Sequence, residues 1–321
     1  MNTFELPGGD RIPTIGFGTF GSDHCAPEQM AQAVETALTA GYRLIDCAQV
    51  YGNEHTIGEV LERAIGSEQI SREELFVASK VWNDQHAPGK PTLALKGSLS
   101  DLRLDYLDAY YVHWPFPNYH APGCDGDSRN PDSKPFSAEE FMGVWRELEQ
   151  LYDEGLVRHL GMSNMTISKL ETVLPQCRVQ PALIEMELHP SFQQPELFQY
   201  CLDHGIRPVG FCPLGSPNRP ERDKTEEDVV DFDLPEVRAI AEAHGVHPAS
   251  ICLKWAAQKG AIPIPFSTTE RNITSNLLAV NEDPLTETEM ASLAAADRDC
   301  RLIKGQVFLW PDAHSWQDLW I

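Results

Sequence analysis

The stretch GYRLIDCAQVYGNE (residues 41–54) joins a short apolar segment to a loop with polar side chains. Within it, RLIDC (43–47) is typical of a short buried strand, and Asp46 lies near its C-terminal end. Tyr51 follows on the next loop. An apolar strand followed by reactive side chains is typical of enzymes built from alternating strands and helices, because chemistry there collects at the C-terminal ends of the strands.

Two segments further along the chain end in the same way. LFVASK (75–80) ends in Lys80, and LDAYYVH (107–113) ends in His113. In a barrel of alternating strands and helices, the C-terminal ends of the strands converge on one face. We therefore expect the lysine and the histidine to meet the aspartate and the tyrosine of the first stretch.

Asp46, Tyr51, Lys80 and His113 together would make a proton-donating site. A tyrosine with a pKa near about 10 is a poor acid at neutral pH. A neighbouring lysine lowers that pKa, an aspartate can hold the lysine, and a histidine can orient and polarise a carbonyl oxygen. Taken singly, Asp46 and Lys80 could form a structural ion pair and His113 could be a core histidine. Taken together, the four residues predict the reduction of an aldehyde or ketone.

The rest of the chain repeats the same unit. Strand-like apolar runs occur at 14–18, 43–47, 75–80, 107–113, 158–162, 182–187, 207–212 and 261–265. Segments with helical spacing of apolar residues lie between them, at 27–40, 58–66, 91–102, 139–155, 195–205, 235–245 and 247–260. Eight such units predict an α/β fold of the (β/α)8 TIM-barrel class. FELPGGDRIP (4–13) predicts an N-terminal β-hairpin that could plug the bottom of the barrel.

No linker or repeat divides the 321 residues, so we expect a single domain over 1–321. Three segments do not fit the repeating unit: 114–134, 216–233 and the tail from Arg301. The first two follow strands, so long loops should overhang the C-terminal face and serve binding. The tail is rich in tryptophan, which favours a wall of the substrate pocket, although these rings could also simply cover barrel helices.

Composition excludes several classes of function. The chain has 25 Lys and Arg against 48 Asp and Glu, a formal charge of −23, and no basic cluster, so neither nucleic acid nor an anionic membrane is an expected partner. The acidic excess suits either a well-solvated surface or a salty cell interior. No apolar run is long enough to span a bilayer and MNTFELPGGD lacks the features of a secretory signal, which predicts a cytoplasmic protein. The 8 cysteines form no CxxC or metal-ligand spacing, so we expect reduced thiols and no metal.

One motif supports a different fold. GFGTFG (16–21) has the GxGxxG spacing of a dinucleotide-binding loop, and Asp46 lies where a Rossmann fold places its ribose-binding acid. The next helical segment begins only near Ala26, however, so no glycine lies in its first turn to receive a pyrophosphate. A Rossmann domain would also leave Tyr51, Lys80 and His113 unexplained. The sequence favours the barrel.

Several motifs in register resemble those of the aldo-keto reductase family, over almost the whole chain. They are GYRLIDCAQVYGNE (41–54), SKVWN (79–83), YYVHWP (110–115), GMSN (161–164), HP (189–190) and PLGSP (213–217). The resemblance implies an enzyme that reduces a small-molecule carbonyl substrate with NADPH or NADH or both. It assigns Tyr51 as proton donor, Lys80 and Asp46 as the pair that makes it a better acid, and His113 as the residue that orients the carbonyl.

The resemblance also implies two sets of binding residues. The expected cofactor-binding residues are Ser163, Asn164, Glu185, Phe211, Leu214, Ser216, Ser267, Arg271, Asn272 and Asn276. The expected substrate-binding residues are Phe20, Trp82, Trp114 and Trp310. A non-catalytic cofactor-binding or structural protein on the same barrel is the alternative, and the presence of both Tyr51 and Lys80 counts against it.

The chain departs from the family pattern at the cofactor. Glu185 stands where the family commonly has a glutamine aimed at the nicotinamide carboxamide, and a carboxylate can donate a hydrogen bond only when protonated. Phe266 replaces the usual lysine of the segment that holds a 2′-phosphate, and Asn272 replaces the usual arginine, with Arg271 next to it. These departures predict weakened discrimination in favour of NADPH.

Overall fold

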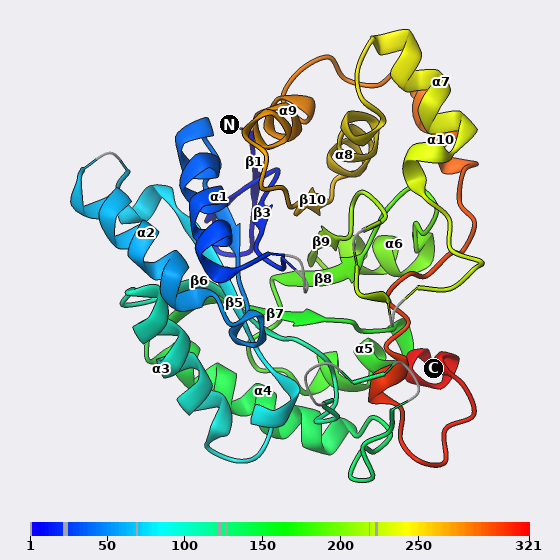
Figure 1. Cartoon of the computed structure of the whole chain (residues 1–321). Helices are drawn as coiled ribbons and strands as arrows, with labels where there is room; N and C mark the ends of the chain where they lie inside the picture. Colours follow the sequence, from blue (N-terminus) through cyan, green and yellow to red (C-terminus); the bar gives the residue numbers. More distant parts are fainter. Residues whose placement is uncertain are drawn as a thin grey trace.

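The computed structural model describes residues 2–21, 25–68, 70–120, 124–125, 128–217, 219–221 and 224–321. An 8-stranded parallel sheet lies at its centre, and the strands follow one another in chain order (Figure 1). The strands are β3 (Phe17–Gly18), β4 (Leu44–Asp46), β5 (Phe76–Val81), β6 (Leu107–Val112), β7 (Val157–Ser163), β8 (Leu183–Glu187), β9 (Arg207–Phe211) and β10 (Ile262–Pro263). Each predicted strand overlaps one of these, so the predicted (β/α)8 architecture is confirmed.

The first and last strands close the barrel, and the GFGTFG motif explains how. Gly16 N–H donates to the Pro263 carbonyl and Gly18 N–H to the Pro265 carbonyl, both at 3.0 Å. A Cβ on Gly16 would lie 2.7 Å from the Leu44 side chain, and one on Gly18 would lie 2.9 Å from the backbone oxygen of Ile264. The glycines are therefore needed for close approach of the two strands. The motif is structural, and the Rossmann alternative is wrong.

Helices form a ring around the strands (Figure 1). They are α1 (Pro27–Ala40), α2 (Glu54–Gly66), α3 (Lys90–Leu102), α4 (Ala138–Asp153), α5 (Ile167–Val173), α6 (Pro195–Asp203), α7 (Pro235–His244), α8 (Pro248–Lys259), α9 (Glu270–Ala279) and α10 (Glu287–Ala294). The predicted helical segments are confirmed, but α5, α9 and α10 lie outside them. Among these, α5 has only 7 residues and α10 buries only Leu293, so their apolar periodicity is weak.

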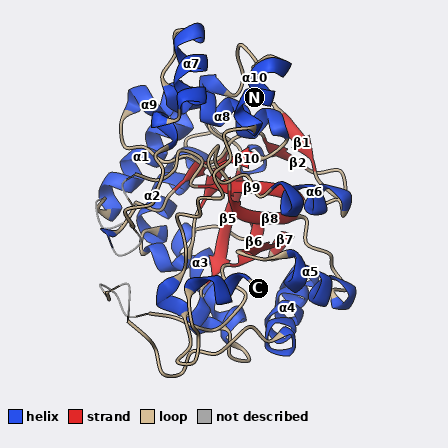
Figure 2. Ribbon diagram, turned by 90° about the vertical axis from the view of Figure 1, so that its right-hand side faces the viewer, coloured by secondary structure: helices blue, strands red, loops and turns tan. Residues whose placement is uncertain are grey.

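The N-terminal hairpin closes the barrel at the end opposite the long loops (Figure 2). Its strands, β1 (Thr3–Glu5) and β2 (Arg11–Pro13), pair in antiparallel fashion, as predicted. Leu6 and Ile12 are buried in the same cluster as the side chains that fill the barrel interior. This cluster also contains Tyr111, and a Cβ on Gly161 would lie 2.3 Å from the Tyr111 ring, so glycine is required there.

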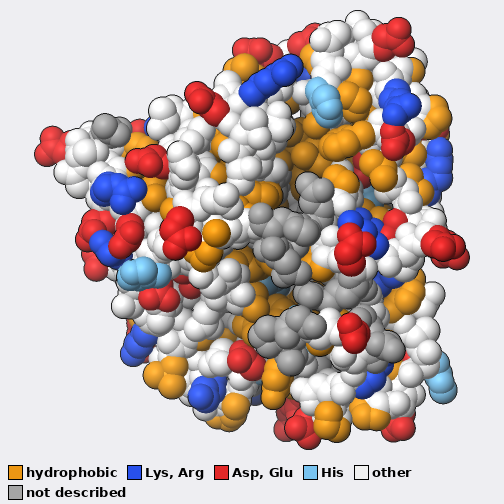
Figure 3. All heavy atoms as spheres, viewed as in Figure 1, with side chains coloured by type: hydrophobic (Ala, Val, Ile, Leu, Met, Phe, Trp, Pro, Cys, Tyr) orange, Lys and Arg blue, Asp and Glu red, His pale blue; other side chains and the backbone are white. Residues whose placement is uncertain are grey.

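The opposite face carries the long loops and the C-terminal tail. The tail forms the short turns η8 (Gln306–Phe308) and η9 (Trp316–Trp320) and ends beside α5 (Figure 1). Its last turn is held by Lys169 of α5, whose Nζ donates to the Leu319 carbonyl at 2.9 Å. In Figure 3, apolar side chains gather around the middle of this face and many acidic side chains stand at its edges. Among the helices of the described residues, none is long and apolar enough to cross a membrane.

Candidate active site

The four predicted catalytic residues come together at the C-terminal ends of adjacent strands. Asp46 is the last residue of β4, Lys80 lies near the end of β5, and His113 follows β6. The Lys80 ammonium contacts the Asp46 carboxylate, with Nζ 2.6 Å from Oδ2, and donates to the Cys47 carbonyl at 3.0 Å. Tyr51 ends the turn η2 (Gln49–Tyr51), with its ring centroid 5.3 Å from the Lys80 Nζ. The ring of His113 stands edge-on to the Tyr51 ring, at 5.8 Å between centroids.

Two buried polar side chains, which follow Tyr51 in the sequence, anchor the turn that carries it. Neither of them was identified from the sequence. Asn53 donates its side-chain N–H to the Thr19 carbonyl at 2.8 Å. Glu54 accepts hydrogen bonds from the hydroxyls of Ser79 and Ser98. The Glu54 interaction links α2 to β5 and α3, and α2 begins four residues before its predicted start at residue 58. These bonds hold the turn that carries Tyr51, whose ring centroid lies 5.3 Å from the Lys80 Nζ.

The local electrostatics favour a charged lysine and a neutral histidine. Lys80 is fully buried, and Asp46 and Glu185 hold its pKa well above the ordinary value against the effect of burial. Burial and the Lys80 charge lower the pKa of His113, so its imidazole is neutral at neutral pH. Burial raises the pKa of Tyr51 above its ordinary value, although Lys80 offsets part of this rise through its charge and a side-chain hydrogen bond. Tyr51 is thus protonated at neutral pH and can donate its proton. The Lys80 ammonium lies close enough to stabilise the phenolate that would form.

Residues predicted to hold the nicotinamide lie on the next strands around the barrel. Ser163 ends β7 and pairs in register with Glu185 of β8, while Phe211 ends β9. The Asn164 side chain donates to the His113 carbonyl at 2.9 Å and to the Ser163 hydroxyl at 3.2 Å. These bonds hold Asn164 in the left-handed conformation, at φ 58°, which is uncommon for a residue other than glycine.

The unpaired atoms of this group fit a carboxamide. Within the described chain, Asn164 Oδ1, Glu185 Oε2 and His113 Nδ1 are buried and have no hydrogen-bond partner, although Glu185 Oε2 lies 3.4 Å from the Lys80 Nζ. Buried polar atoms of a folded protein are normally paired, so unpaired ones at the centre of the loop face indicate a ligand. Asn164 and Glu185 are neighbours, since the Asn164 N–H donates to the Glu185 carbonyl at 3.1 Å, and their side-chain oxygens are acceptors of the kind that suits the amide N–H donors of a nicotinamide carboxamide. The residues present therefore fit a nicotinamide cofactor.

The other predicted cofactor residues lie along the rim formed by the loops after β9 and β10. Leu214 and Ser216 belong to a tight turn that includes Gly215, at φ 72°, where a Cβ would lie 2.4 Å from Asp231 Oδ2. The Ser267 hydroxyl accepts from the Thr269 N–H at 3.1 Å, before α9. Three further predicted residues lie on α9 itself: Arg271 and Asn272, which are exposed in its first turn, and Asn276, which is buried.

The predicted substrate residues fall into two groups. Phe20 and Trp82 lie beside the catalytic residues: the Phe20 ring is 5.0 Å from Tyr51 and the Trp82 ring is 4.9 Å from His113. Trp114 and Trp310 instead belong to an apolar cluster of the tail, in which the Trp114 ring packs 4.7 Å from Phe308. The Phe308 ring lies 5.9 Å from Trp82 and so connects the two groups.

Comparisons with known proteins agree with this geometry. The profile of the "Aldo/keto reductase family" matches residues 14–298. An aldo/keto reductase of Synechocystis sp. is 37% identical over 321 residues, covering 100% of this chain and 96% of that protein. The aldo-keto reductase family 1 member A1 of Homo sapiens is 39% identical over 297 residues, covering 92% and 89%. The solved structure of an aldose reductase from Schistosoma japonicum matches with a TM-score of 0.81 and 33% identity, covering 95% of each chain.

The chain belongs to the aldo-keto reductase family. Its activity is the NAD(P)H-dependent reduction of a carbonyl group, as the sequence predicted. The cofactor of this reductase is NADPH or NADH.

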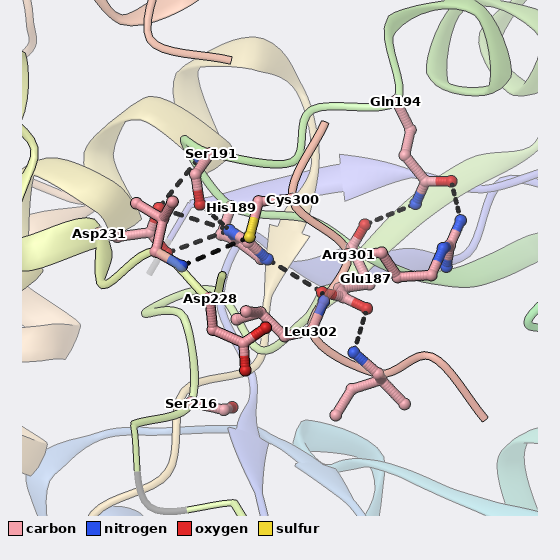
Figure 4. A network of polar contacts seen from close by, with 12 residues as sticks. Glu187, His189, Ser191, Gln194, Ser216, Asp228, Asp231, Cys300, Arg301 and Leu302 are labelled. Carbon is pink, nitrogen blue, oxygen red and sulfur yellow. Dashed lines mark hydrogen bonds and ion pairs between the residues drawn. The ribbon is translucent and has the colours of Figure 1, made fainter. Parts of the chain in front are cut away.

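This aldo-keto reductase has a second buried polar network, which includes Glu187 at the end of β8, the strand that also carries Glu185 (Figure 4). His189 is fully buried between two carboxylates, with Nε2 3.0 Å from Glu187 and Nδ1 3.1 Å from Asp231. Glu187 also accepts the backbone N–H groups of Leu302 and Ile303, at 2.6 and 3.0 Å. The network ties β8 to the loop after β9 and to the start of the tail. Only the HP dipeptide of this network was identified from the sequence, as a family motif. No local sequence pattern indicates that His189 pairs with the distant Asp231.

The two carboxylates make His189 a buried cation. They raise the pKa of His189 to about 9, against the effect of burial. A raised pKa in the folded state means that folding favours the protonated form, so this stabilisation is complete below about pH 6.5 and is lost as the pH rises through about 9. The difference between the two pKa values corresponds to at most about 3 kcal/mol of stability.

We expect His189→Gln to lower the free energy of unfolding by about 3–5 kcal/mol at pH 6.5, because two buried carboxylates lose their cation. The loss should shrink as the pH rises toward 9.5, since the wild type then loses its imidazolium as well. Urea unfolding at several pH values measures both effects. A variant with unchanged stability at pH 6.5 would contradict the charged triad.

The chain offers a matched control for this experiment. His244 also lies between two carboxylates, Asp283 at 2.6 Å and Glu289 at 2.8 Å, but Asp283 is mostly exposed to solvent. Ion pairs open to water contribute about 0–1 kcal/mol. His244→Gln should therefore have only a small effect at the same pH.

Proposed function

We propose that this aldo-keto reductase is an aldehyde reductase in which Tyr51 donates the proton, Lys80 and Asp46 support it, and His113 orients the carbonyl. The observation that carries the proposal is the Lys80 ammonium held at 2.6 Å by Asp46, beneath the Tyr51 ring and beside a neutral His113. The binding roles of the other predicted residues, and a single domain over 1–321, are part of the same proposal.

The reduced nicotinamide, when bound, supplies the hydride that adds to the carbonyl carbon. The Tyr51 hydroxyl gives its proton to the carbonyl oxygen, so hydride and proton together convert the carbonyl to an alcohol. The Lys80 charge stabilises the phenolate form of Tyr51 that remains after the proton is transferred. The neutral imidazole of His113 donates a hydrogen bond to the carbonyl oxygen, where negative charge develops. Ser163, Asn164 and Glu185 would hold the carboxamide, and Phe211 would lie against the nicotinamide ring.

We infer that the substrate is a small aldehyde, with sugar aldehydes and aromatic aldehydes as the first candidates. The structural relative is named an aldose reductase, which supports the sugar class. The rings of Phe20 and Trp82 beside the catalytic residues support an aromatic or hydrophobic group next to the carbonyl. Loss of NAD(P)H absorbance with a panel of aldoses, aromatic aldehydes and ketones tests the proposal. Tight cofactor binding with no turnover of any of them would favour the non-catalytic alternative.

Cofactor choice should be less strict than in a strongly NADPH-specific enzyme. Recognition of a 2′-phosphate depends on charge-assisted hydrogen bonds from Lys or Arg. Phe266 offers none and packs toward Phe17, at 6.3 Å between rings, while Arg271 is exposed. One missing cationic contact corresponds to about 1.5–3 kcal/mol, or about ten- to a hundred-fold in affinity. We therefore expect activity with NADH alongside NADPH, and we expect Arg271→Ala to raise the KM for NADPH selectively.

The measurement is kcat/KM for both cofactors in the wild type and three variants. Phe266→Lys should increase the preference for NADPH, and Arg271→Ala should decrease it. Arg146→Ala, which removes an exposed arginine of α4 on another side of the barrel, should change neither. A wild-type preference for NADPH above about a thousand-fold, untouched by Arg271→Ala, would mean that another residue holds the phosphate.

A further inference from the structure

Two buried carboxylates share one lysine at the centre of the site. The Lys80 Nζ lies 2.6 Å from Asp46 Oδ2 and 3.4 Å from Glu185 Oε2, and both acids are only 3% exposed. The other titratable groups that interact with Glu185 are Tyr51 on η2 and Tyr111 on β6, and both are neutral phenols. If both acids were ionised, the group would carry an uncompensated negative charge in a buried place, which is strongly unfavourable.

The geometry indicates which acid keeps a proton. Asp46 makes a short hydrogen bond to the ammonium, whereas Glu185 Oε2 has no hydrogen-bond partner among the described residues. Burial and the neighbouring Asp46 raise the pKa of Glu185 to about 8, despite Lys80. At neutral pH the group is then balanced, with one ammonium, one ionised aspartate and one protonated glutamate.

We propose that Glu185 holds a proton when the reduced cofactor is bound and releases it to solvent when the oxidised cofactor is bound. Glu185 would thereby make the relative affinity for the reduced and oxidised cofactor depend on pH. The inference rests on the proposed function, which places the nicotinamide beside Ser163, Asn164 and Glu185. The reduced ring is neutral and suits the protonated acid. The oxidised ring carries one positive charge, and the ionised Glu185 restores the balance. A glutamine at this position could form hydrogen bonds but could not exchange a proton.

The direction of the pH effect follows from this charge balance. A cation close to a carboxylate lowers its pKa by about 1–3, so the oxidised complex should release the Glu185 proton at a lower pH than the free enzyme does. Raising the pH should therefore tighten binding of the oxidised form relative to the reduced form. If the pKa of Glu185 differs by about 1 between the two complexes, their relative affinity changes by about tenfold. Between pH 6.5 and pH 9 we expect the ratio of Kd for the reduced form to Kd for the oxidised form to rise by about tenfold or more.

The test is direct binding, without turnover. Titrations with NADPH and NADP⁺ are followed by protein fluorescence at each pH, and the ratio of the two Kd values removes the titration of the phosphates that both forms share. Calorimetry at pH 7.5 in two buffers of different ionisation enthalpy should show proton release with NADP⁺ and little with NADPH. Glu185→Gln should make the ratio independent of pH and abolish the release.

A buried glutamate elsewhere serves as the control. Glu149 of α4 accepts the backbone N–H groups of Arg178 and Val179, so Glu149→Gln should keep the wild-type pH slope. Normal binding of both cofactors with a flat ratio and no proton release in the wild type would overturn this inference alone. A Glu185→Gln protein that keeps the wild-type slope would overturn it too, because another group would then carry the proton. Failure of the wild type to bind either cofactor would refute the proposed function itself.

Discussion

Tyr51→Phe is expected to reduce kcat by about 10²–10⁴-fold, the range typical of a lost general acid. The substitution removes only the hydroxyl, so the ring should keep its contacts with Phe20 and His113. Cofactor affinity should stay close to that of the wild type, because Tyr51 acts on the carbonyl oxygen. Single-turnover reduction of an aldehyde and a fluorescence titration with NADPH measure the two quantities separately.

The control for Tyr51 is a tyrosine outside the site. Tyr152 lies on α4 and is 39% exposed, so Tyr152→Phe should behave like the wild type in both measurements. If Tyr51→Phe retained most of the wild-type turnover, the proton would have to come from another group, and the proposed chemistry would be wrong.

Lys80→Met is expected to lose activity by a similar factor and, unlike Tyr51→Phe, to lower stability as well. Without the ammonium, the Tyr51 phenolate has no cation to stabilise it. The ionised Asp46 also loses its only ion-pair partner among the described residues, which lies 2.6 Å away. Removing one member of a buried ion pair costs about 3–5 kcal/mol. Aldehyde reduction and urea unfolding of the same preparation measure both effects.

A double variant separates the two effects of this lysine. In Lys80→Met/Asp46→Asn the buried aspartate charge is removed together with the ammonium, so much of the stability should return. Activity should not return, because Tyr51 still lacks its cation. Recovery of activity together with stability would show that Lys80 is only a structural partner of Asp46.

Local sequence pattern was sufficient to predict the strands and the residues at their ends. Asp46, Lys80 and His113 lie in or next to strand-like segments, and the barrel brings them together because its strands are parallel and in chain order. The 2.6 Å contact of Asp46 with Lys80 follows from β4 and β5 being neighbours. Carbonyl reduction was predictable because the residue types at these neighbouring strand ends suit proton donation to a carbonyl.

Contacts across the barrel could not be predicted in this way. Glu185 on β8 reaches Lys80 on β5, three strands away, because both side chains point into the barrel. His189 meets Asp231 only because the loop after β9 folds back over β8. Trp114 packs against Phe308 of the tail. This contact could not be predicted, because the position of the tail depends on tertiary contacts such as that of Lys169 with Leu319. These features depend on the closed barrel and on loops without a repeating pattern.

Transfer of the cofactor hydride is the central claim, and an isotope label tests it most directly. The enzyme is incubated with an aldehyde and NADPH carrying deuterium on the transferable position of the nicotinamide, and the alcohol is analysed by mass spectrometry. We predict one deuterium on the carbinol carbon with the wild type and almost none formed in the same time with Tyr51→Phe. Alcohol that forms without deuterium, or no alcohol from any aldehyde of the panel while NADPH binds tightly, would contradict the account.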